Sequence, residues 1–124
     1  MQINREPRSL HTIQSYSDTQ ITLNHTSYSA NLIISRCDII SPWAIHSVFD
    51  LNEESLTPML AQKPEVILIG HTKGAIQLPM PLVQYLANLG IGIENMSIGA
   101  ACRTFNVLLS EQREVVLGIV FANP

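Results

Sequence analysis

The sequence predicts an α/β fold in which a largely parallel sheet follows a short β-meander. The first third of the chain contains short β-prone runs, and the second half alternates strand, helix, strand, helix and strand. Such alternation is typical of a parallel sheet with right-handed crossovers. The 124 residues are 46% hydrophobic and 14% charged, which suits one domain, residues 1–124, whose core needs no disulfide or metal.

The meander is expected because apolar residues near positions 21–23 and 32–34 favour strands. Asp18 and the polar stretch 24–27 supply turn residues between these runs. The Ser-Pro-Trp segment 41–43 then interrupts the strand pattern. We therefore expect the meander to end near Ile40.

A short helix and a buried strand are expected next. The helix is predicted from Ser55 to Gln62, with Thr57 as its N-cap and Pro58 at its first helical position. Pro64 stops it. The run Val66–Ile69 is apolar throughout, as expected of a strand that is covered on both faces.

Four further elements complete the alternation. A helix is predicted from an apolar face with helical spacing, and Gly90 is its predicted C-cap. This face consists of Leu82, Val83, Leu86 and Leu89. The remaining predicted elements are a strand over Ile91–Met96, a helix over about Gly99–Ser110 and a strand over Glu114–Phe121.

Composition excludes several classes of function. The net charge is −3, the pI is near 5.7, and seven basic residues are scattered from Arg5 to Arg113, so no nucleic-acid partner is expected. Cys37 and Cys102 form no CxxC pair, which favours reduced thiols in a cytoplasmic protein. The four histidines lack metal-ligand spacing and the acidic residues are dispersed. We therefore expect no metal, no two-carboxylate hydrolase and no cofactor.

Direct insertion into a membrane is not expected either. Residues Met1–Arg8 are polar, and no apolar stretch follows them as in a signal peptide. The longest apolar stretch, Val115–Ala122, is far shorter than the roughly 20 residues that span a bilayer. Any association with an inner membrane would therefore run through a protein partner.

Two loops that leave the carboxyl ends of predicted strands gather the polar residues. They are 70–74 and 95–98, and ligands of open α/β sheets bind at such ends. Free amides at the start of the following helix, together with Lys73 and Arg103, favour an anion or a carbonyl oxygen. The alternative is that the glycines serve turn geometry, because neither loop has the spacing of a nucleotide site. The predicted pocket comprises Gly70, His71, Lys73, Glu94, Met96, Cys102, Arg103, Thr104 and Asn106.

Three of the polar or aromatic candidates have two interpretations each. The Cys102 thiol, in the first turn of a helix, could act as a nucleophile with His71 as its base, or it could simply pack. Arg103 could pair with Glu94 or present its guanidinium to a carboxylate ligand. Trp43 could anchor the core or mark an interface. We favour packing, the ion pair and the core anchor, and we assign no catalytic residue.

Several segments resemble one protein family over nearly the whole chain. They are Pro64–Gly70, Gly90–Met96, Ala100–Leu108 and Ser41–Trp43. The chain thereby resembles the family of the mitochondrial respiratory complex I assembly factor 3 and its bacterial and archaeal relatives, which share an Mth-type domain. The resemblance implies a three-layer α/β fold. Its mixed central sheet is mostly parallel with one antiparallel strand, and extra β-structure packs on it.

The resemblance also implies a pocket without an assigned reaction. For the mitochondrial member it implies a role as an assembly partner at the inner membrane. This sequence departs from the family pattern in both pocket loops, because His71-Thr72 replace Thr-Gly and Ser97-Ile98 replace Asp-Thr. The second departure removes an acidic residue.

Two functions from different classes follow. The first is a non-enzymatic accessory or assembly factor that binds a protein partner, such as a subunit of a respiratory or inner-membrane complex. It rests on the resemblance and on the lack of a catalytic constellation. The alternative is a small-molecule or anion-binding protein, or an enzyme, that uses a crevice near Gly70, Cys102 and Arg103. The sequence leaves the oligomeric state open.

Overall fold

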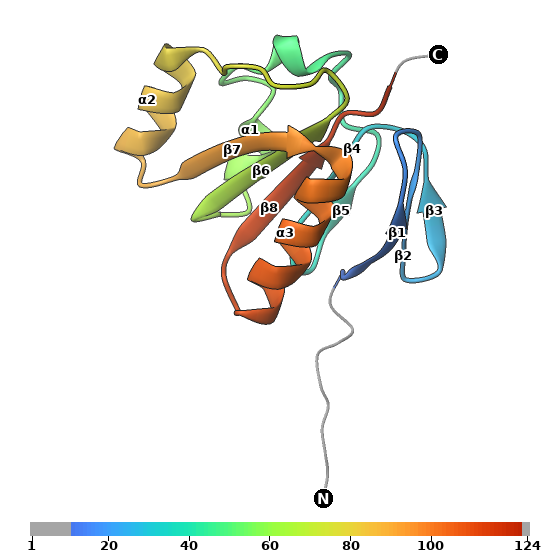
Figure 1. Ribbon diagram of the computed structural model, residues 1–124. Helices are drawn as coiled ribbons and strands as arrows, with labels where there is room; N and C mark the ends of the chain where they lie inside the picture. Colours follow the sequence, from blue (N-terminus) through green and yellow to red (C-terminus); the bar gives the residue numbers. More distant parts are fainter. Residues whose placement is uncertain (1–10, 123–124) are drawn as a thin grey trace, which may run out of the picture.

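The computed structural model describes residues 11–122 and arranges them in layers around a five-stranded sheet (Figure 1). Residues Met1–Arg8, which were considered above as a possible leader, lie outside the described part. The strands are β1 (Ile13–Tyr16), β2 (Ile21–Leu23), β3 (Thr26–Tyr28), β4 (Leu32–Ile34), β5 (Ile39–Ile40), β6 (Val66–His71), β7 (Gly92–Ser97) and β8 (Val115–Ile119). The helices are the 3-10 turn η2 (Val48–Asp50), α1 (Thr57–Leu60), α2 (Met80–Asn88) and α3 (Ile98–Ser110).

The central sheet is mixed and mostly parallel, as predicted. Its strand order is β5-β4-β8-β6-β7. β6 runs parallel to both β7 and β8, whereas β4 is antiparallel to β8 and to β5. β4 is therefore the one strand of this sheet that runs against the others, which agrees with the resemblance.

The sheet carries a core on each face. α3 and the meander cover one face, where the fully buried Phe105 packs in a cluster with Leu68. α1, α2 and the segment around Trp43 cover the other face and form a cluster with Ile67 and Ile69. The connections β6-α2-β7 and β7-α3-β8 run in opposite directions along the sheet. Right-handed crossovers therefore place α2 and α3 on opposite faces, which produces three layers.

The β-meander is confirmed, but it ends at Tyr28 rather than near Ile40, because β4 and β5 join the central sheet. Its second turn is also tighter than predicted. β1, β2 and β3 form a separate antiparallel sheet. The turn between β2 and β3 consists of Asn24 and His25, whose φ angles are 53° and 63°. Two successive positive φ angles are the signature of a type I′ hairpin turn. The predicted turn over 24–27 is wrong at its end, because Thr26 and Ser27 already pair with β2.

The first helix is shorter than predicted. α1 covers Thr57–Leu60 rather than Ser55–Gln62, and Leu56 rather than Thr57 is its N-cap. The Thr57 hydroxyl donates to the Glu53 carbonyl oxygen at 3.2 Å, so it points back along the chain instead of capping the helix. The other predicted elements are present, with ends shifted by a residue or two.

Trp43 is a core anchor, as predicted. Its side chain is 4% exposed, and its Nε1 donates to the Ser55 carbonyl oxygen at 3.0 Å. The indole lies directly on β8 at Gly118, where a Cβ atom would stand only 2.6 Å from the ring carbon Cζ3. The absence of a side chain at Gly118 is therefore what allows the indole to seat.

We expect Gly118→Ala to lower the free energy of unfolding by about 1–3 kcal/mol, because an added methyl group overpacks the core against a rigid ring. Gly92→Ala is the matched control, since a Cβ there meets nothing within 4 Å. Its expected change is within about 0.5 kcal/mol. Urea denaturation followed by tryptophan fluorescence measures both. Equal stability of the two variants would contradict the close packing of Trp43 on β8.

Candidate functional site

A crevice lies where β6 and β7 end, and we call it the strand-end crevice. Its volume is about 580 Å³. The parallel register sets His71 beside Ser97, so the two loops that leave these strands meet, as the sequence predicts. The lining residues are Asp18, His71, Thr72, Gly74, Ala75, Ile76, Asn95, Met96 and Ser97. Two residues of the predicted pocket, His71 and Met96, are among them.

His71 is a buried hub of the crevice wall, 2% exposed. The backbone N–H of Lys73 donates to His71 Nδ1 at 3.0 Å, so this nitrogen is not protonated. The proton therefore sits on Nε2, which donates to Asn95 Oδ1 at 2.9 Å. The Asn95 amide in turn donates to the Ile76 carbonyl oxygen at 3.4 Å. Both ring nitrogens are thus occupied in holding the 72–79 segment to the strand ends.

Ser97 serves as the N-cap of α3. Its side chain accepts a hydrogen bond from the Ala100 backbone N–H at 3.2 Å. Serine and aspartate are both favoured N-caps, so the departure from the acidic family residue preserves this structural role. One of the helix amides that the sequence offered to an anion is therefore already satisfied.

The charge of the crevice differs from the prediction. Within the part of the chain that the structure describes, its one charged lining residue is Asp18, which comes from the turn between β1 and β2. Neither Lys73 nor Arg103 lines it. The described lining therefore offers a carboxylate rather than the cations that an anion site needs.

Arg103 binds Tyr16 instead of Glu94, which corrects the predicted ion pair. Its guanidinium donates to the Tyr16 hydroxyl at 2.6 Å and lies 5.9 Å from the centre of the ring. Gly99 makes room for this contact, since a Cβ there would lie 2.8 Å from the Tyr16 ring. Among residues 11–122, the ion pairs join Arg36 to Glu114 and Arg113 to Glu65. The pairing of Arg103 across 87 residues could not be read from local spacing.

Thr104 and Asn106 also have structural partners. The Thr104 hydroxyl donates to the Ala100 carbonyl oxygen at 2.8 Å. The Asn106 amide clamps β1, because it accepts from the Ile13 N–H at 2.9 Å and donates to the Ile13 carbonyl oxygen at 3.0 Å. These two side chains hold α3 together and attach the meander to it.

Gly70 and Cys102 lie inside the molecule rather than at the crevice. A Cβ at Gly70 would stand 2.9 Å from Ala101 Cβ, so α3 presses directly on β6. The Cys102 side chain is fully buried in the core cluster beneath α3. This burial raises the pKa of the Cys102 thiol to about 12, against a weaker opposing effect of the Arg103 charge. A buried, protonated thiol is a packing residue, not a nucleophile.

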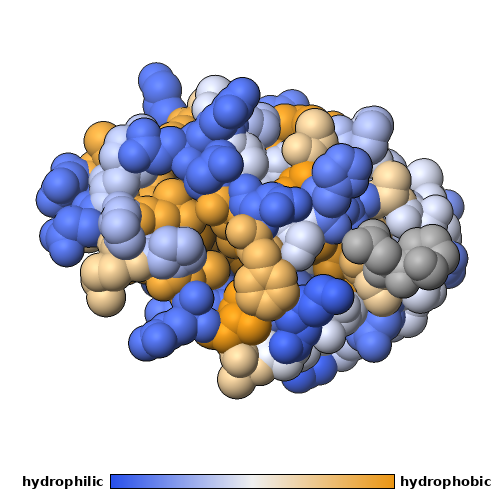
Figure 2. Space-filling view, turned by 90° about the horizontal axis from the view of Figure 1, so that it is seen from above, coloured by the Kyte–Doolittle hydropathy of each residue, from blue (hydrophilic) through white to orange (hydrophobic). Residues whose placement is uncertain are grey.

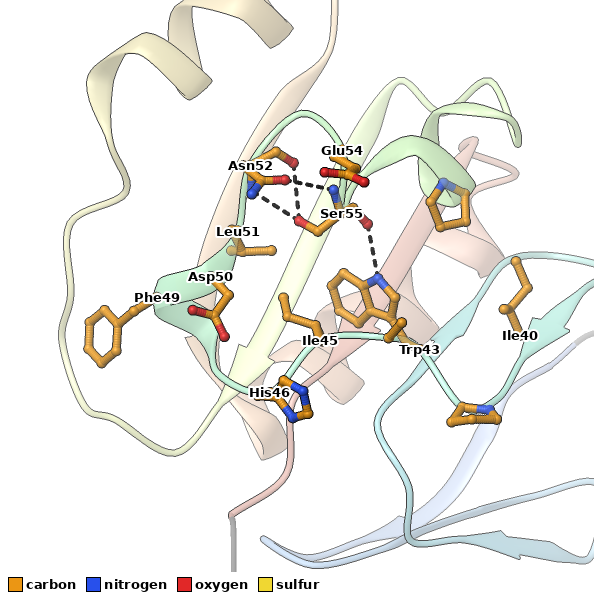
Figure 3. A pocket seen from close by; sticks show the side chains of 13 residues that line it. Ile40, Trp43, Ile45, His46, Phe49, Asp50, Leu51, Asn52, Glu54 and Ser55 are labelled. Carbon is orange, nitrogen blue, oxygen red and sulfur yellow. Dashed lines mark hydrogen bonds between the residues drawn. The ribbon is translucent and has the colours of Figure 1, made fainter.

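A second depression, which we call the Trp43 groove, was not foreseen from the sequence. It has a volume of about 890 Å³. Figure 3 shows Trp43 beside Ile45, with Asn52 and Ser55 above them, Asp50 on the far side of Ile45 and Phe49 pointing away. Phe49 is 65% exposed. Ser47 caps η2 by accepting a hydrogen bond from the Phe49 N–H at 3.2 Å, but no local sequence signal indicates the groove itself.

A third depression, the edge hollow, lies between α2 and β7. Its volume is about 330 Å³. It contains the predicted pocket residue Glu94, which the structure separates from the strand-end crevice. The lining residues are Ile76, Gln77, Leu78, Met80, Val83, Ile93, Glu94 and Asn95.

Residues 11–122 bear on two further expectations, the absence of a metal site and the absence of a membrane-spanning segment. Within this range no three or more His, Cys, Asp or Glu side chains gather closely enough to hold a metal ion. No helix of the same range combines the length and the hydrophobicity needed to cross a bilayer.

The amino-acid sequence matches a known family and several curated proteins. The model of a family described as a protein of unknown function (DUF498/DUF598) matches residues 13–120. A 13 kDa major membrane protein of Francisella tularensis is 29% identical over 81% of this chain and 82% of its own length. The NADH dehydrogenase [ubiquinone] 1 alpha subcomplex assembly factor 3 of Xenopus tropicalis is 24% identical over 95% of this chain. The match spans only 65% of that assembly factor.

Solved structures share the fold. A Bordetella parapertussis protein superposes with a TM-score of 0.82 at 28% identity, over 91% of this chain and 97% of its own. A Bordetella pertussis protein described as an Mth938-like domain superposes with a TM-score of 0.78 at 24% identity, over 97% and 92%. These similarities confirm the predicted Mth-type fold.

We expect Asn95→Ala to lower the free energy of unfolding by about 1–3 kcal/mol, because it leaves the buried His71 Nε2–H without an acceptor. The same variant should accelerate hydrogen exchange of the Lys73 amide, since the 72–79 segment loses its anchor. Gln77→Ala, in the same segment but with an exposed side chain, is the control. Unchanged exchange at Lys73 in Asn95→Ala would contradict the proposed role of this network.

The two cysteines should react differently with iodoacetamide at pH 8. The exposed Cys37 should be alkylated and the buried Cys102 should not, as mass spectrometry of the native protein can show. Because the folded-state pKa of Cys102 is raised, the unfolded thiol ionises first as pH rises. Stability should therefore fall between the ordinary thiol pKa and about 12, and this fall should be smaller in Cys102→Ala. Two adducts on the native protein would refute this burial.

Proposed function

The chain belongs to the DUF498/DUF598 family, and from this premise we propose that it is a non-enzymatic accessory protein that binds a protein partner. The names of its relatives support this proposal, because several of them are assembly factors of NADH dehydrogenase. We infer that the partner is a component of a respiratory or other inner-membrane complex. The protein would then act in the cytoplasm or at the membrane surface through that partner.

The observation that carries the proposal is an apolar surface at the carboxyl end of the parallel strands. Figure 2 looks down on this end and shows a hollowed apolar region that hydrophilic side chains surround. Two large apolar residues are each 65% exposed: Phe49 on η2, which lines the Trp43 groove, and Met80 at the start of α2, which lines the edge hollow. Phenylalanine and methionine are enriched at protein interfaces, because a partner buries apolar side chains that are exposed to water in the free protein.

The chemistry of the candidate residues also favours binding over catalysis. Both nitrogens of His71 are engaged in hydrogen bonds, so neither is available to take a proton from a substrate. The Cys102 thiol is buried and the Arg103 guanidinium is bound to Tyr16. The side chains that the sequence offered for a reaction are thus committed to holding the fold.

A second candidate function is the binding of a small molecule in the strand-end crevice. Its position at the carboxyl ends of parallel strands favours this function, and so does its volume of about 580 Å³. Asp18, its one charged lining residue, favours a neutral or cationic ligand over an anion. This candidate does not explain the exposure of Phe49 and Met80, so we rank it second.

We expect Phe49→Ser to reduce recovery of the partner in quantitative affinity purification of the tagged protein from mildly solubilised native cells. A central aromatic contact is worth about 2 kcal/mol or more, which corresponds to roughly thirtyfold weaker binding. Val107→Ser is the matched control, because Val107 is a 53% exposed apolar residue on α3. Thermal unfolding verifies both folds. Equal partner recovery with the two variants, or recovery of the protein alone, would count against the proposal and favour the crevice.

A further inference from the structure

The outer edge of β7 offers unpaired backbone groups. β7 is an edge strand of the central sheet, and within residues 11–122 no strand pairs with its outer side. The Gly92 N–H donates inward to the Glu65 carbonyl oxygen at 3.1 Å. The backbone N–H and C=O groups of successive residues point alternately to the two sides of a strand. Those of Glu94 and Met96 therefore also point toward β6. The N–H and C=O groups of Ile93 and Asn95 therefore point away from the sheet.

These outward groups form a template for another strand. Natural proteins protect such edges with proline, lysine or a bulge. The sequence of β7, Gly-Ile-Glu-Asn-Met-Ser, contains neither proline nor lysine, and its pairing with β6 is regular along its length. Extended peptides commonly bind by adding a strand to an edge of this kind.

The edge hollow supplies a place for a side chain next to this template. Ile93 and Asn95, whose backbone groups face outward, both line the hollow. On its other side the hollow is lined by Met80 and Val83 of α2. A strand added to β7 would carry every second side chain toward the α2 face of the sheet, where this hollow lies. Apolar side chains at alternate positions would contact the apolar residues of the lining, such as Met80, Val83 and Ile93.

Charge selects the partner further. Among residues 11–122, Glu94 is the one charged residue that lines the hollow, and it is exposed. A lysine or arginine in the added strand would meet this carboxylate. In the antiparallel register centred on Glu94, a second copy of the chain would set two carboxylates directly opposite each other, which disfavours that pairing.

We propose that β7 accepts an extended segment of a partner protein as an additional strand. The segment alternates apolar and basic residues, places an apolar side chain in the edge hollow and a cation near Glu94. This inference rests on the proposed function, and it specifies how the partner is held.

The test uses the ¹⁵N-labelled full chain and a capped synthetic octapeptide of alternating valine and lysine. Backbone amide hydrogen exchange should slow at Ile93 and Asn95 when the peptide binds. The amides of Gly92, Glu94 and Met96 should change little, because they already face β6. This alternating pattern distinguishes strand addition from binding that merely covers the surface.

Two N-methylated peptides make the test independent of strand direction. One is methylated at every valine nitrogen and the other at every lysine nitrogen, and these nitrogens lie on opposite edges of an extended peptide. Strand addition predicts that one of the two loses binding and the other retains it, whichever way the peptide runs. Equal binding of both, or equal loss, would overturn the proposal.

A charge reversal tests the role of Glu94. Glu94→Lys should weaken binding of the unmodified peptide by about five- to tenfold, as expected for a partly exposed charge at an interface. Glu111→Lys, which makes the same charge change at the end of α3, should leave the affinity unchanged. If both variants weaken binding equally, the net charge of the protein explains the effect. Glu94 would then not be the residue that contacts the cation of the peptide.

The failures of the two proposals are distinguishable. Recovery of a partner from cells tests the proposed function, whereas the exchange pattern tests the edge alone. If a partner is recovered from cells but the amides of Ile93 and Asn95 are not selectively protected by the peptide, strand addition is wrong and the proposed function still stands. Concentration-dependent protection of the same amides without peptide would show that the edge pairs with a second copy, and would also overturn this inference.

Discussion

The close approach of α3 to β6 is the constraint on which the rest of the structure depends. At Gly70 there is no room for a side chain, since a Cβ would lie 2.9 Å from Ala101 Cβ and 3.2 Å from Ile98 Cα. β7 passes into α3 without an intervening residue, so the seat of the helix on β6 also fixes where β7 ends. That end forms one wall of the strand-end crevice, and its Ser97 caps the helix. A single glycine contact thereby sets both the layer spacing and the position of the candidate site.

The surface that follows from this architecture agrees with the proposed role in binding a partner. The polar side chains near the strand ends are occupied in holding backbone segments, as His71 and Asn95 hold the 72–79 segment. Among residues 11–122, the exposed features that suit a partner are apolar side chains such as Phe49 and Met80 and a strand edge with which no strand pairs. Accessory proteins need such features, because they hold partners without changing them covalently. The assembly-factor names among the relatives agree with a protein whose polar side chains near the strand ends are hydrogen-bonded and whose apolar side chains are exposed.

Much of the fold could be predicted from the sequence, whereas the composition of the site could not. Hydrophobic periodicity is a local signal, and it located β6, α2, β7, α3 and β8 to within a residue or two. The faces of side chains depend on packing between distant segments. Cys102 and Arg103 are adjacent in the sequence, yet α3 turns the first into the core and the second toward Tyr16. The exposure of Phe49 likewise depends on the path of the chain after Trp43, which no short pattern records.

The pairing of β4 with β8 has a consequence for the order in which the molecule assembles. Leu32 of β4 lies opposite Ile119 of β8, so strands from the two ends of the described chain share one ladder. The clamp between Ile13 and Asn106 spans a similar distance along the sequence. During synthesis, β4 must therefore wait for β8, the last strand of the central sheet to be made, before the two can pair. Contacts of such long range slow folding and prolong the exposure of apolar strands. The nascent chain therefore carries β4 without its β8 neighbour until the last strand of the central sheet has been made.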